Sequence, residues 1–229
     1  DSERGIAWRV ADSLSLRDFL GFGLAEQTPD HSTVSRTRRL YSVETHKAVF
    51  QWMAKVLGAK GLMDGQTVAI DGTTLEANAA MRSIQRRDDG RKYDEYLKDL
   101  AQAEGIESPT REQLARWDRK RKKKASNKDW MSPSDPDARI TKMKDGRTHL
   151  AHKAEHAVDL ASGAIVAVTL QAADQGDTTT VRETLKEAQA NAQLVNERGV
   201  EELVADKGYH SGATLVAMHG KSVRTYIPE

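Results

Sequence analysis

The sequence predicts a mixed α/β fold, and two observations lead to that prediction. Two short apolar runs end in an acid, VAID at residues 68–71 and LVAD at 203–206, and stretches with helical periodicity lie around and between them. Strands that alternate with helices in one chain are typical of an α/β sheet covered by helices. A chain of 229 residues, 38% of them apolar, is long enough for one large domain with smaller attachments.

The composition excludes several kinds of site. Cysteine is absent, so disulfides and thiolate metal sites are excluded, and a metal would need oxygen or imidazole ligands, of which oxygen points to Mg²⁺ or Mn²⁺. No apolar run approaches the roughly 20 residues of a membrane span, and the N-terminus has no signal-peptide pattern. We expect a cytoplasmic protein with no membrane partner. The chain begins at Asp1 and stops after YIPE, so we also expect a fragment.

Residues 1–62 are expected to form a helical N-terminal region. Helical signals run from residue 13 to about 58, where SLRD (15–18) resembles a capping box and a helix is predicted over 44–57. The stretch TPDHSTVSRTRRLY (28–41) breaks at a proline and then offers serines and arginines at a helix start, where phosphates bind. That helix could contact DNA, or it could pack on the rest of the protein.

The larger region, 63–229, begins with a strand predicted over Thr67–Asp71. A polar, helical pattern is expected from Leu75 to Gln85. Residues of about 86–137 then form a helical, basic insertion, in which Thr110–Gln113 resembles a capping box.

After the insertion the pattern becomes that of strands. Lys144–Arg147 predicts a hairpin with a strand on each side, because Asp-Gly suits a type I′ turn. With the strand that follows, a series of three antiparallel strands is expected. A helix is expected to begin at Asp177 and Thr178 as its N-cap. Its apolar face is marked by Val181, Leu185, Ala188, Ala192 and Val195. In order, the elements are two strands, that helix, a strand, a helix and a strand, over residues 148–158, 164–171, 177–196, 203–206, 211–219 and 223–227.

Asp71 and Asp206 occur in matching contexts, since each follows an apolar run and precedes a glycine within two residues. Parallel strands lie about 4.8 Å apart, and ligands of open α/β sheets bind beyond the carboxyl ends of strands. If the two strands are neighbours, the carboxylates converge and repel each other unless a cation lies between them. Divalent metals held in this way support attack on a phosphodiester. The alternative is a plain turn, for which Asp-Gly is a common signal.

Longer motifs around these acids resemble a known family. They are VAIDGTTLEANAAM (68–81), DPDARITKMKDGRTHLAHKAEHAVDLASGAIVAVTLQAADQGDTTT (135–180), VADKGYHS (204–211), RTYIPE (224–229) and, near the N-terminus, FLGFGLAEQTPDHSTVSRTRRL (19–40). Together they resemble bacterial insertion-sequence transposases of the DDE type, in the broad IS4/IS5-like group. The resemblance covers nearly the whole chain.

The resemblance implies an RNase H-like mixed sheet, incomplete at its C-terminus, with the basic insertion between its first and second strands. In the family one catalytic Asp ends the first strand and another ends the fourth, which match Asp71 and Asp206. The third acid, a Glu on a later helix, is not present in this chain, because Glu229 comes too early. The resemblance further implies Mg²⁺ or Mn²⁺, as two ions, double-stranded DNA of element ends and target as partner, a homodimer in the active complex, and association with the nucleoid.

Candidate DNA contacts lie in two places. The first is the basic run of the insertion, Arg116–Lys128, which is either a phosphate-binding surface or a solvated charged helix. The residues beside Asp206 either contact phosphate or serve ordinary loop packing. The candidates are Arg119, Lys120, Arg121, Lys122, Lys123, Lys124, Lys207, Tyr209 and His210.

Three histidines in the strand of residues 148–158 suggest a zinc site, but their spacing is not that of HExxH. On a strand His152 and His156 share a face, whereas His149 points the other way, so a structural or DNA-facing role is favoured. Three further acids, Asp159, Asp174 and Asp177, are better explained as turn and cap residues, although Asp174 or Asp177 could lie near the substrate.

Three functions are consistent with the sequence. The first is a DNA transposase that cleaves phosphodiesters and transfers strands with the help of a metal. The second is a catalytically incomplete fragment that binds DNA or dimerises. The third is an RNase H-like nuclease that uses the same acids without strand transfer.

Overall fold

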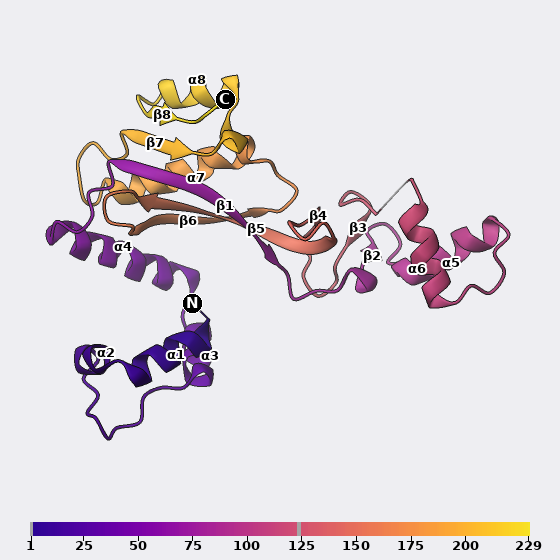
Figure 1. Cartoon of the computed structure of the whole chain (residues 1–229), viewed down its shortest axis with the longest axis horizontal. Coiled ribbons are helices and arrows are strands. Elements are labelled where there is room, and N and C mark those ends of the chain that lie inside the picture. Colours follow the sequence, from indigo (N-terminus) through magenta and orange to yellow (C-terminus); the bar gives the residue numbers. More distant parts are fainter. Residues whose placement is uncertain (1, 123–124) are drawn as a thin grey trace. The chain divides into compact units, whose positions relative to one another are not determined.

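The computed structural model describes residues 2–122 and 125–229. It divides the chain into two compact units, one that reaches Met53 and one that runs from Ala54 to Glu229. The helices and strands, labelled in Figure 1, are α1 (Glu3–Asp12), α2 (Leu14–Phe19), α3 (His31–Leu40), α4 (Val43–Ala59), β1 (Thr67–Glu76), β2 (Gln85–Arg86), α5 (Tyr93–Ala103), α6 (Arg111–Lys120), β3 (Trp130–Met131), β4 (Arg139–Lys142), β5 (Thr148–Asp159), β6 (Ile165–Ala172), α7 (Asp177–Ala192), β7 (Glu202–Ala205), α8 (Gly212–His219) and β8 (Arg224–Tyr226).

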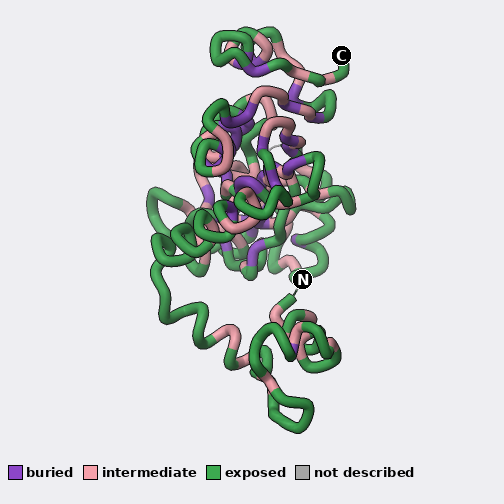
Figure 2. The backbone as a smooth tube through the Cα atoms, turned by 90° about the vertical axis from the view of Figure 1, so that its left-hand side faces the viewer, coloured by how far each residue is buried: buried purple, intermediate pink, exposed green. Residues whose placement is uncertain are grey.

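The N-terminal unit consists of short capped helices. The side chains of Ser2, Ser13 and Asp30 each accept a hydrogen bond from the first turn of α1, α2 and α3. The cap of α2 is therefore Ser13, and the predicted capping box over residues 15–18 was wrong because the helix begins at Leu14. The guanidinium of buried Arg17 donates to several carbonyls of the following loop. Polar contacts of this kind carry much of the local order, since most of the unit is exposed (Figure 2).

The second unit is built on a mixed sheet of six strands. Its path is β4-β5-β1-β7-β8, and β6 pairs with β5 as well. The pairs that join β5 to β1, β4 and β6 are antiparallel, whereas β1–β7 and β7–β8 are parallel. The predicted series of three antiparallel strands is confirmed in β4, β5 and β6. The parallel pair β1–β7 sets Ile70, within β1, beside Ala205 at the carboxyl end of β7.

Helix α7 packs on one face of this sheet. Its predicted apolar face is confirmed, since Val181, Leu185, Ala188 and Ala192 are buried in one cluster with residues of β1 and β7. Val68, Ile70 and Leu203 face this helix and are at most 2% exposed. Burial of apolar surface stabilises a fold by about 25 cal/mol per Å². This cluster contains more buried residues than the other clusters of the unit, so it contributes most to the unit's stability.

Two local expectations around β1 were wrong. The strand does not end at Asp71 but continues to Glu76, because β5 pairs with it from Val68 to Glu76. The helical pattern predicted from Leu75 to Gln85 is replaced by the end of β1, a single 3₁₀ turn at Met81–Ser83 and the short strand β2. A long cross-strand partner thus overrides the local preference of the sequence.

The hairpin turn and the N-cap of α7 also differ from the predictions. At the hairpin between β4 and β5, Gly146 has a φ of +79° but Asp145 does not have a positive φ, so the turn is not of type I′. At α7 the N-cap is Gly176, and Asp177 is the first helical residue. The side chain of Asp177 is instead engaged by Lys153.

The segment between β1 and β4, where a helical insertion is expected, contains α5 and α6 together with β2 and β3. Strands β2 and β3 pair antiparallel, and the capping box of α6 is confirmed by reciprocal hydrogen bonds between Thr110 and Gln113. Trp130 is buried against Tyr93 and Tyr96, with ring centroids 4.9 and 5.1 Å apart. No helix in the described part of the chain is long and apolar enough to span a membrane.

Candidate functional site

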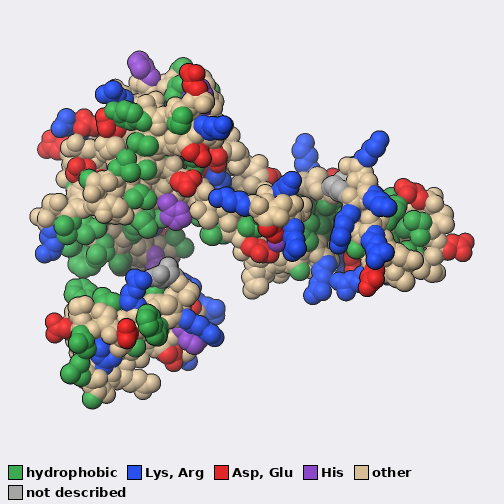
Figure 3. Space-filling model, viewed as in Figure 1, with side chains coloured by type: hydrophobic (Ala, Val, Ile, Leu, Met, Phe, Trp, Pro, Cys, Tyr) green, Lys and Arg blue, Asp and Glu red, His purple; other side chains and the backbone are tan. Residues whose placement is uncertain are grey.

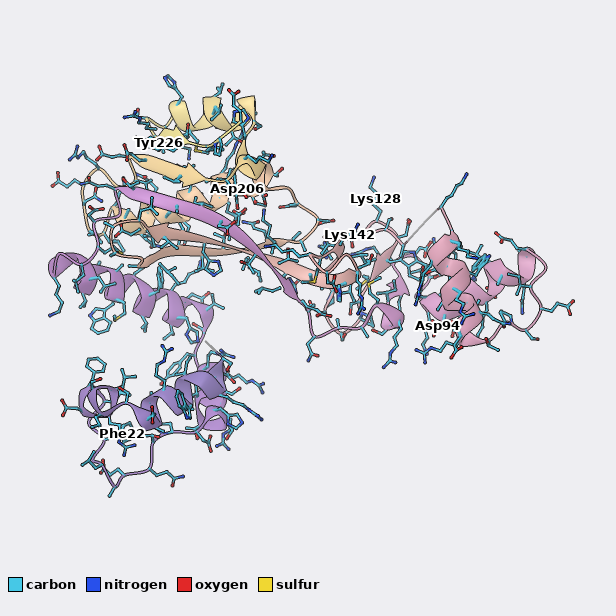
Figure 4. The ribbon with its side chains drawn as sticks, in the orientation of Figure 1. Phe22, Asp94, Lys128, Lys142, Asp206 and Tyr226 are labelled. Carbon is cyan, nitrogen blue, oxygen red and sulfur yellow. The ribbon has the colours of Figure 1, made fainter. Side chains whose placement is uncertain are left out.

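The candidate site lies where β1 and β7 run side by side. Their parallel register pairs Ile70 with Ala205 as its last step, so Asp71 is the next residue of β1 and Asp206 is the first residue after β7. Strands so paired are about 4.8 Å apart. The sequence predicts that the two carboxylates converge, and the register sets the residues that precede them side by side (Asp206 is labelled in Figure 4).

Asp71 projects from the sheet face opposite to α7. Successive side chains of a strand alternate between faces, and Val68 and Ile70 are buried under α7 whereas Asp71 is exposed. The ladder between β1 and β5 places His156 directly opposite Asp71, and paired residues share a face. His156 therefore borders the candidate site on the side of β5.

Each carboxylate of the pair accepts one backbone hydrogen bond. Asp71 Oδ1 accepts from the amide of Gly72 at 2.8 Å. Asp206 Oδ1 accepts from the amide of Gly208 at 2.8 Å and thereby caps a 3₁₀ turn over Lys207–Tyr209. These bonds fix the orientation of the two carboxylates.

A further acid, Asp177, faces the same turn. A β-carbon at position 208 would lie 2.8 Å from Asp177 Oδ2 and 2.9 Å from Asp206 Oδ1. The two carboxylates therefore converge on one point of the Gly208 backbone. Neither carboxylate could approach so closely if residue 208 carried a side chain.

Buried polar residues behind the site were not predicted. Lys153 and Glu155 lie two apart on β5 and are 6% and 0% exposed. Their ammonium and carboxylate are 2.8 Å apart, and Thr180 and Thr184 of α7 donate to the carboxylate. The available signal was a pair of opposite charges at i and i+2 of a predicted strand, a spacing that places both side chains on one face.

Of the residues beside Asp206, Tyr209 is buried and Lys207 is exposed. The Tyr209 hydroxyl donates to Glu155 Oε1 at 3.3 Å. Burial, reinforced by the nearby carboxylates of Glu155 and Asp177, raises the pKa of Tyr209 well above its usual value. Tyr209 therefore packs in the interior, as the loop-packing alternative predicted. Lys207 and half-buried His210 lie on the surface close to Asp206 in the sequence.

The basic run of the insertion is partly exposed. Arg119, Lys120 and Lys122 are exposed at and after the end of α6, whereas Arg121 packs over Trp117 and pairs with Asp118 at 2.9 Å. Lys and Arg side chains gather over this insertion in Figure 3. Two candidates, Lys123 and Lys124, lie outside the described residues.

The remaining predicted polar residues have partners in the fold. His149 contacts the carboxylates of Glu76 and Asp145 at 2.8 and 3.0 Å, and these hydrogen bonds raise the pKa of His149. His152 contacts Asp135 at 2.9 Å. As turn or loop acids, Asp159 accepts hydrogen bonds from Ser162 and Asp174 accepts one from Asn127.

The donor set suits a hard divalent cation. Among residues 2–122 and 125–229, no three His, Asp or Glu side chains gather as a metal-binding cluster. Two exposed carboxylates on neighbouring strands nevertheless fit Mg²⁺ or Mn²⁺, because Mg²⁺ takes one or two carboxylates from a protein and completes its shell with water and phosphate oxygens. Asp71 and Asp206 are the residues that would hold it.

Comparison with known proteins bears on the N-terminal region. None of the curated proteins compared with the chain matches it. A family model described as "Transposase domain (DUF772)" matches residues 1–40, which include α1, α2 and α3. This match supports a relationship between the chain and the transposases.

Proposed function

We propose that the chain carries the first two acids of a DDE-type transposase site on an RNase H-like sheet. The proposed activity is cleavage of phosphodiesters at the ends of an insertion element and transfer of the strands to target DNA. The observation that carries the proposal is the parallel register that pairs Ile70 with Ala205, the residues immediately before Asp71 and Asp206. The strand order β4-β5-β1-β7-β8 and the transposase-domain match at residues 1–40 support it.

In this proposal Asp71 and Asp206 bind one or two Mg²⁺ or Mn²⁺ ions from adjacent strand ends. Such ions, when bound, stabilise charge on the attacking and leaving oxygens of a phosphodiester. The backbone amides of Gly72 and Gly208 donate to the two carboxylates and keep them oriented. Lys207 lies next to Asp206 on the surface, where its ammonium would attract a DNA phosphate.

The test is a DNA assay with Mg²⁺ that scores cleavage and joining separately. Asp71→Asn and Asp206→Asn preserve side-chain size and remove the charge, so each should abolish reaction and leave DNA binding intact. Asp137→Asn is the matched control, because Asp137 is an exposed acid of the loop before β4. Reaction retained by either site variant would contradict the assignment, and cleavage without joining would favour the RNase H-like nuclease.

A second candidate function follows from the incomplete set of acids. Since no three acids gather in the described part of the chain, the chain as given would act as a DNA-binding or dimerising part of such an enzyme. Specific binding of element-end DNA without reaction, by a chain that still binds Mn²⁺, would favour this alternative. Sedimentation of the DNA complex would show whether it contains the expected homodimer.

The exposed basic residues of the insertion are proposed to contact DNA phosphates. Replacing Lys120 and Lys122 by Ala should weaken binding to all sequences alike and reduce the slope of log K against log salt by up to about 1 per lysine. Lys186→Ala on α7 is the control, because Lys186 is equally exposed and lies in another element. An unchanged salt slope would show that the run is a solvated helix end.

A further inference from the structure

Lys153 is a lysine enclosed by partners. Its ammonium donates to Asp177 Oδ1 at 2.5 Å and to Thr180 Oγ1 at 2.8 Å, and it lies 2.8 Å from Glu155 Oε1. An ammonium has three donors, and these three partners can use all of them. The ammonium of Lys153 therefore binds only groups of the protein itself and has no donor left for a ligand.

The same partners connect three elements behind the candidate site. Glu155 of β5 accepts hydrogen bonds from Thr180 and Thr184 of α7 and from Tyr209 of the turn after Asp206. Asp177, the first residue of α7, is held through Oδ1 by Lys153 while Oδ2 faces Gly208. The network therefore links β5 and α7 to the 206–209 turn.

The glycines that follow the two acids are explained by this network. A β-carbon at Gly72 would lie 2.9 Å from Lys153 Cε and 3.2 Å from the Tyr209 hydroxyl, and one at Gly208 would meet Asp177 and Asp206. Neither Gly72 nor Gly208 has a positive φ. Both positions therefore require glycine for close approach and not for a turn.

We propose that Lys153 and Asp177 are positioning residues for the pair Asp71 and Asp206. Lys153 supports the backbone of β1 immediately after Asp71, on the face opposite to its carboxylate. It also fixes Asp177 against Gly208, and that contact sets the turn that orients Asp206. The inference rests on the proposed function in its choice of Asp71 and Asp206 as the metal-binding acids.

The test adds a methyl group without changing any charge. Gly208→Ala should displace the carboxylates of Asp177 and Asp206, which are the ends of short side chains, and so disturb the site more than the fold. Gly212→Ala is the matched control, because nothing lies within 4 Å of a β-carbon at that position. Asp177→Ala and the double variant Asp177→Ala with Gly208→Ala complete a double-mutant cycle. Removal of the Asp177 side chain makes room for the methyl group at position 208.

Two quantities are measured on the full chain, the dissociation constant of Mn²⁺ by calorimetry and amide hydrogen exchange at residues 207–209. We expect Gly208→Ala to weaken Mn²⁺ binding by about 10-fold to 100-fold, as loss of outer-shell support does. Exchange in the turn should accelerate, and most of the change should vanish in the Asp177→Ala background. The inference would be overturned if Gly208→Ala changed Mn²⁺ binding and amide exchange no more than Gly212→Ala does. It would also be overturned if the effects of Gly208→Ala and Asp177→Ala were additive in the double variant.

The exchange measurement separates this inference from the proposed function. If the unaltered chain binds no Mn²⁺, the metal assignment of Asp71 and Asp206 fails, but exchange in the turn is still measured. Faster exchange in Gly208→Ala, relieved by Asp177→Ala, would then still support positioning of the turn by Asp177. Unchanged exchange would overturn positioning whatever the metal result.

Discussion

Replacement of Lys153 by methionine tests the buried charge network through the stability of the protein. Methionine is similar in length and removes only the ammonium. Glu155, which is 0% exposed, would then carry a charge without its counterion. Asp177 would lose the same partner, but its side chain is 38% exposed, so water can replace the ammonium there.

The size of the effect follows from that burial. Breaking a buried ion pair by removing one partner costs about 3–5 kcal/mol. Three hydroxyl groups still donate to Glu155 after the change, so we expect a loss near the lower end, about 3 kcal/mol. A domain has about 5–15 kcal/mol in total. Removing both charges, in Lys153→Met with Glu155→Gln, should recover at least about half of the loss.

The assay is urea unfolding at pH 7, with the free energy of unfolding extrapolated to water and the slope compared between variants. Arg91→Met is the control, because Arg91 pairs with Asp99 at 2.9 Å but both side chains are largely exposed, at 45% and 61%. Exposed pairs contribute at most about 1 kcal/mol. A loss for Lys153→Met no larger than that of the control, or a double variant no more stable than the single one, would refute the reasoning.

Three further predictions concern other parts of the fold. The raised pKa of His149 means that its bonds to Glu76 and Asp145 stabilise the protein fully below about pH 6.5 and lose that effect as the pH rises through the folded-state pKa. His149→Gln should therefore lower the melting temperature at pH 6 more than at pH 8, and an equal loss at both would contradict the assignment. Leu203→Ala, at a fully buried position of β7, should cost about 2–5 kcal/mol of unfolding free energy in urea titration. Thr110→Ala should remove the cap of α6 at a cost of about 0.5–2 kcal/mol, detected as faster amide exchange confined to that helix, and no change would show that the cap is dispensable.

The sequence predicted those parts of the site that depend on local pattern. Apolar runs that end in an acid located β7, the core of β1 and the positions of Asp71 and Asp206, because burial of a strand imposes a periodicity that is visible in one segment. The hydrophobic face of α7 was visible for the same reason. None of these required knowledge of what the segment packs against.

Features that depend on distant partners were not predictable. Asp-Gly-Thr-Thr after Ile70 resembles a turn, yet β1 continues because β5, far along the chain, pairs with it. Asp177 resembles an N-cap, yet Lys153 of β5 binds its carboxylate. In both cases a long-range contact outweighs a local preference of about 1 kcal/mol.

The parallel ladder between β1 and β7 also has a consequence for the order of folding. Thr67 and Glu202, which its first step brings into hydrogen-bond contact, are 135 residues apart. Closing so long a loop is entropically costly until intervening contacts shorten it, so we expect β1 to pair with β5 before β7 joins. Pulse-labelled hydrogen exchange during refolding would show amides of β5 protected earlier than those of β7. A chain that is still folding would then hold Asp71 and Asp206 apart, so the metal binding proposed for this pair would begin only when the sheet is complete.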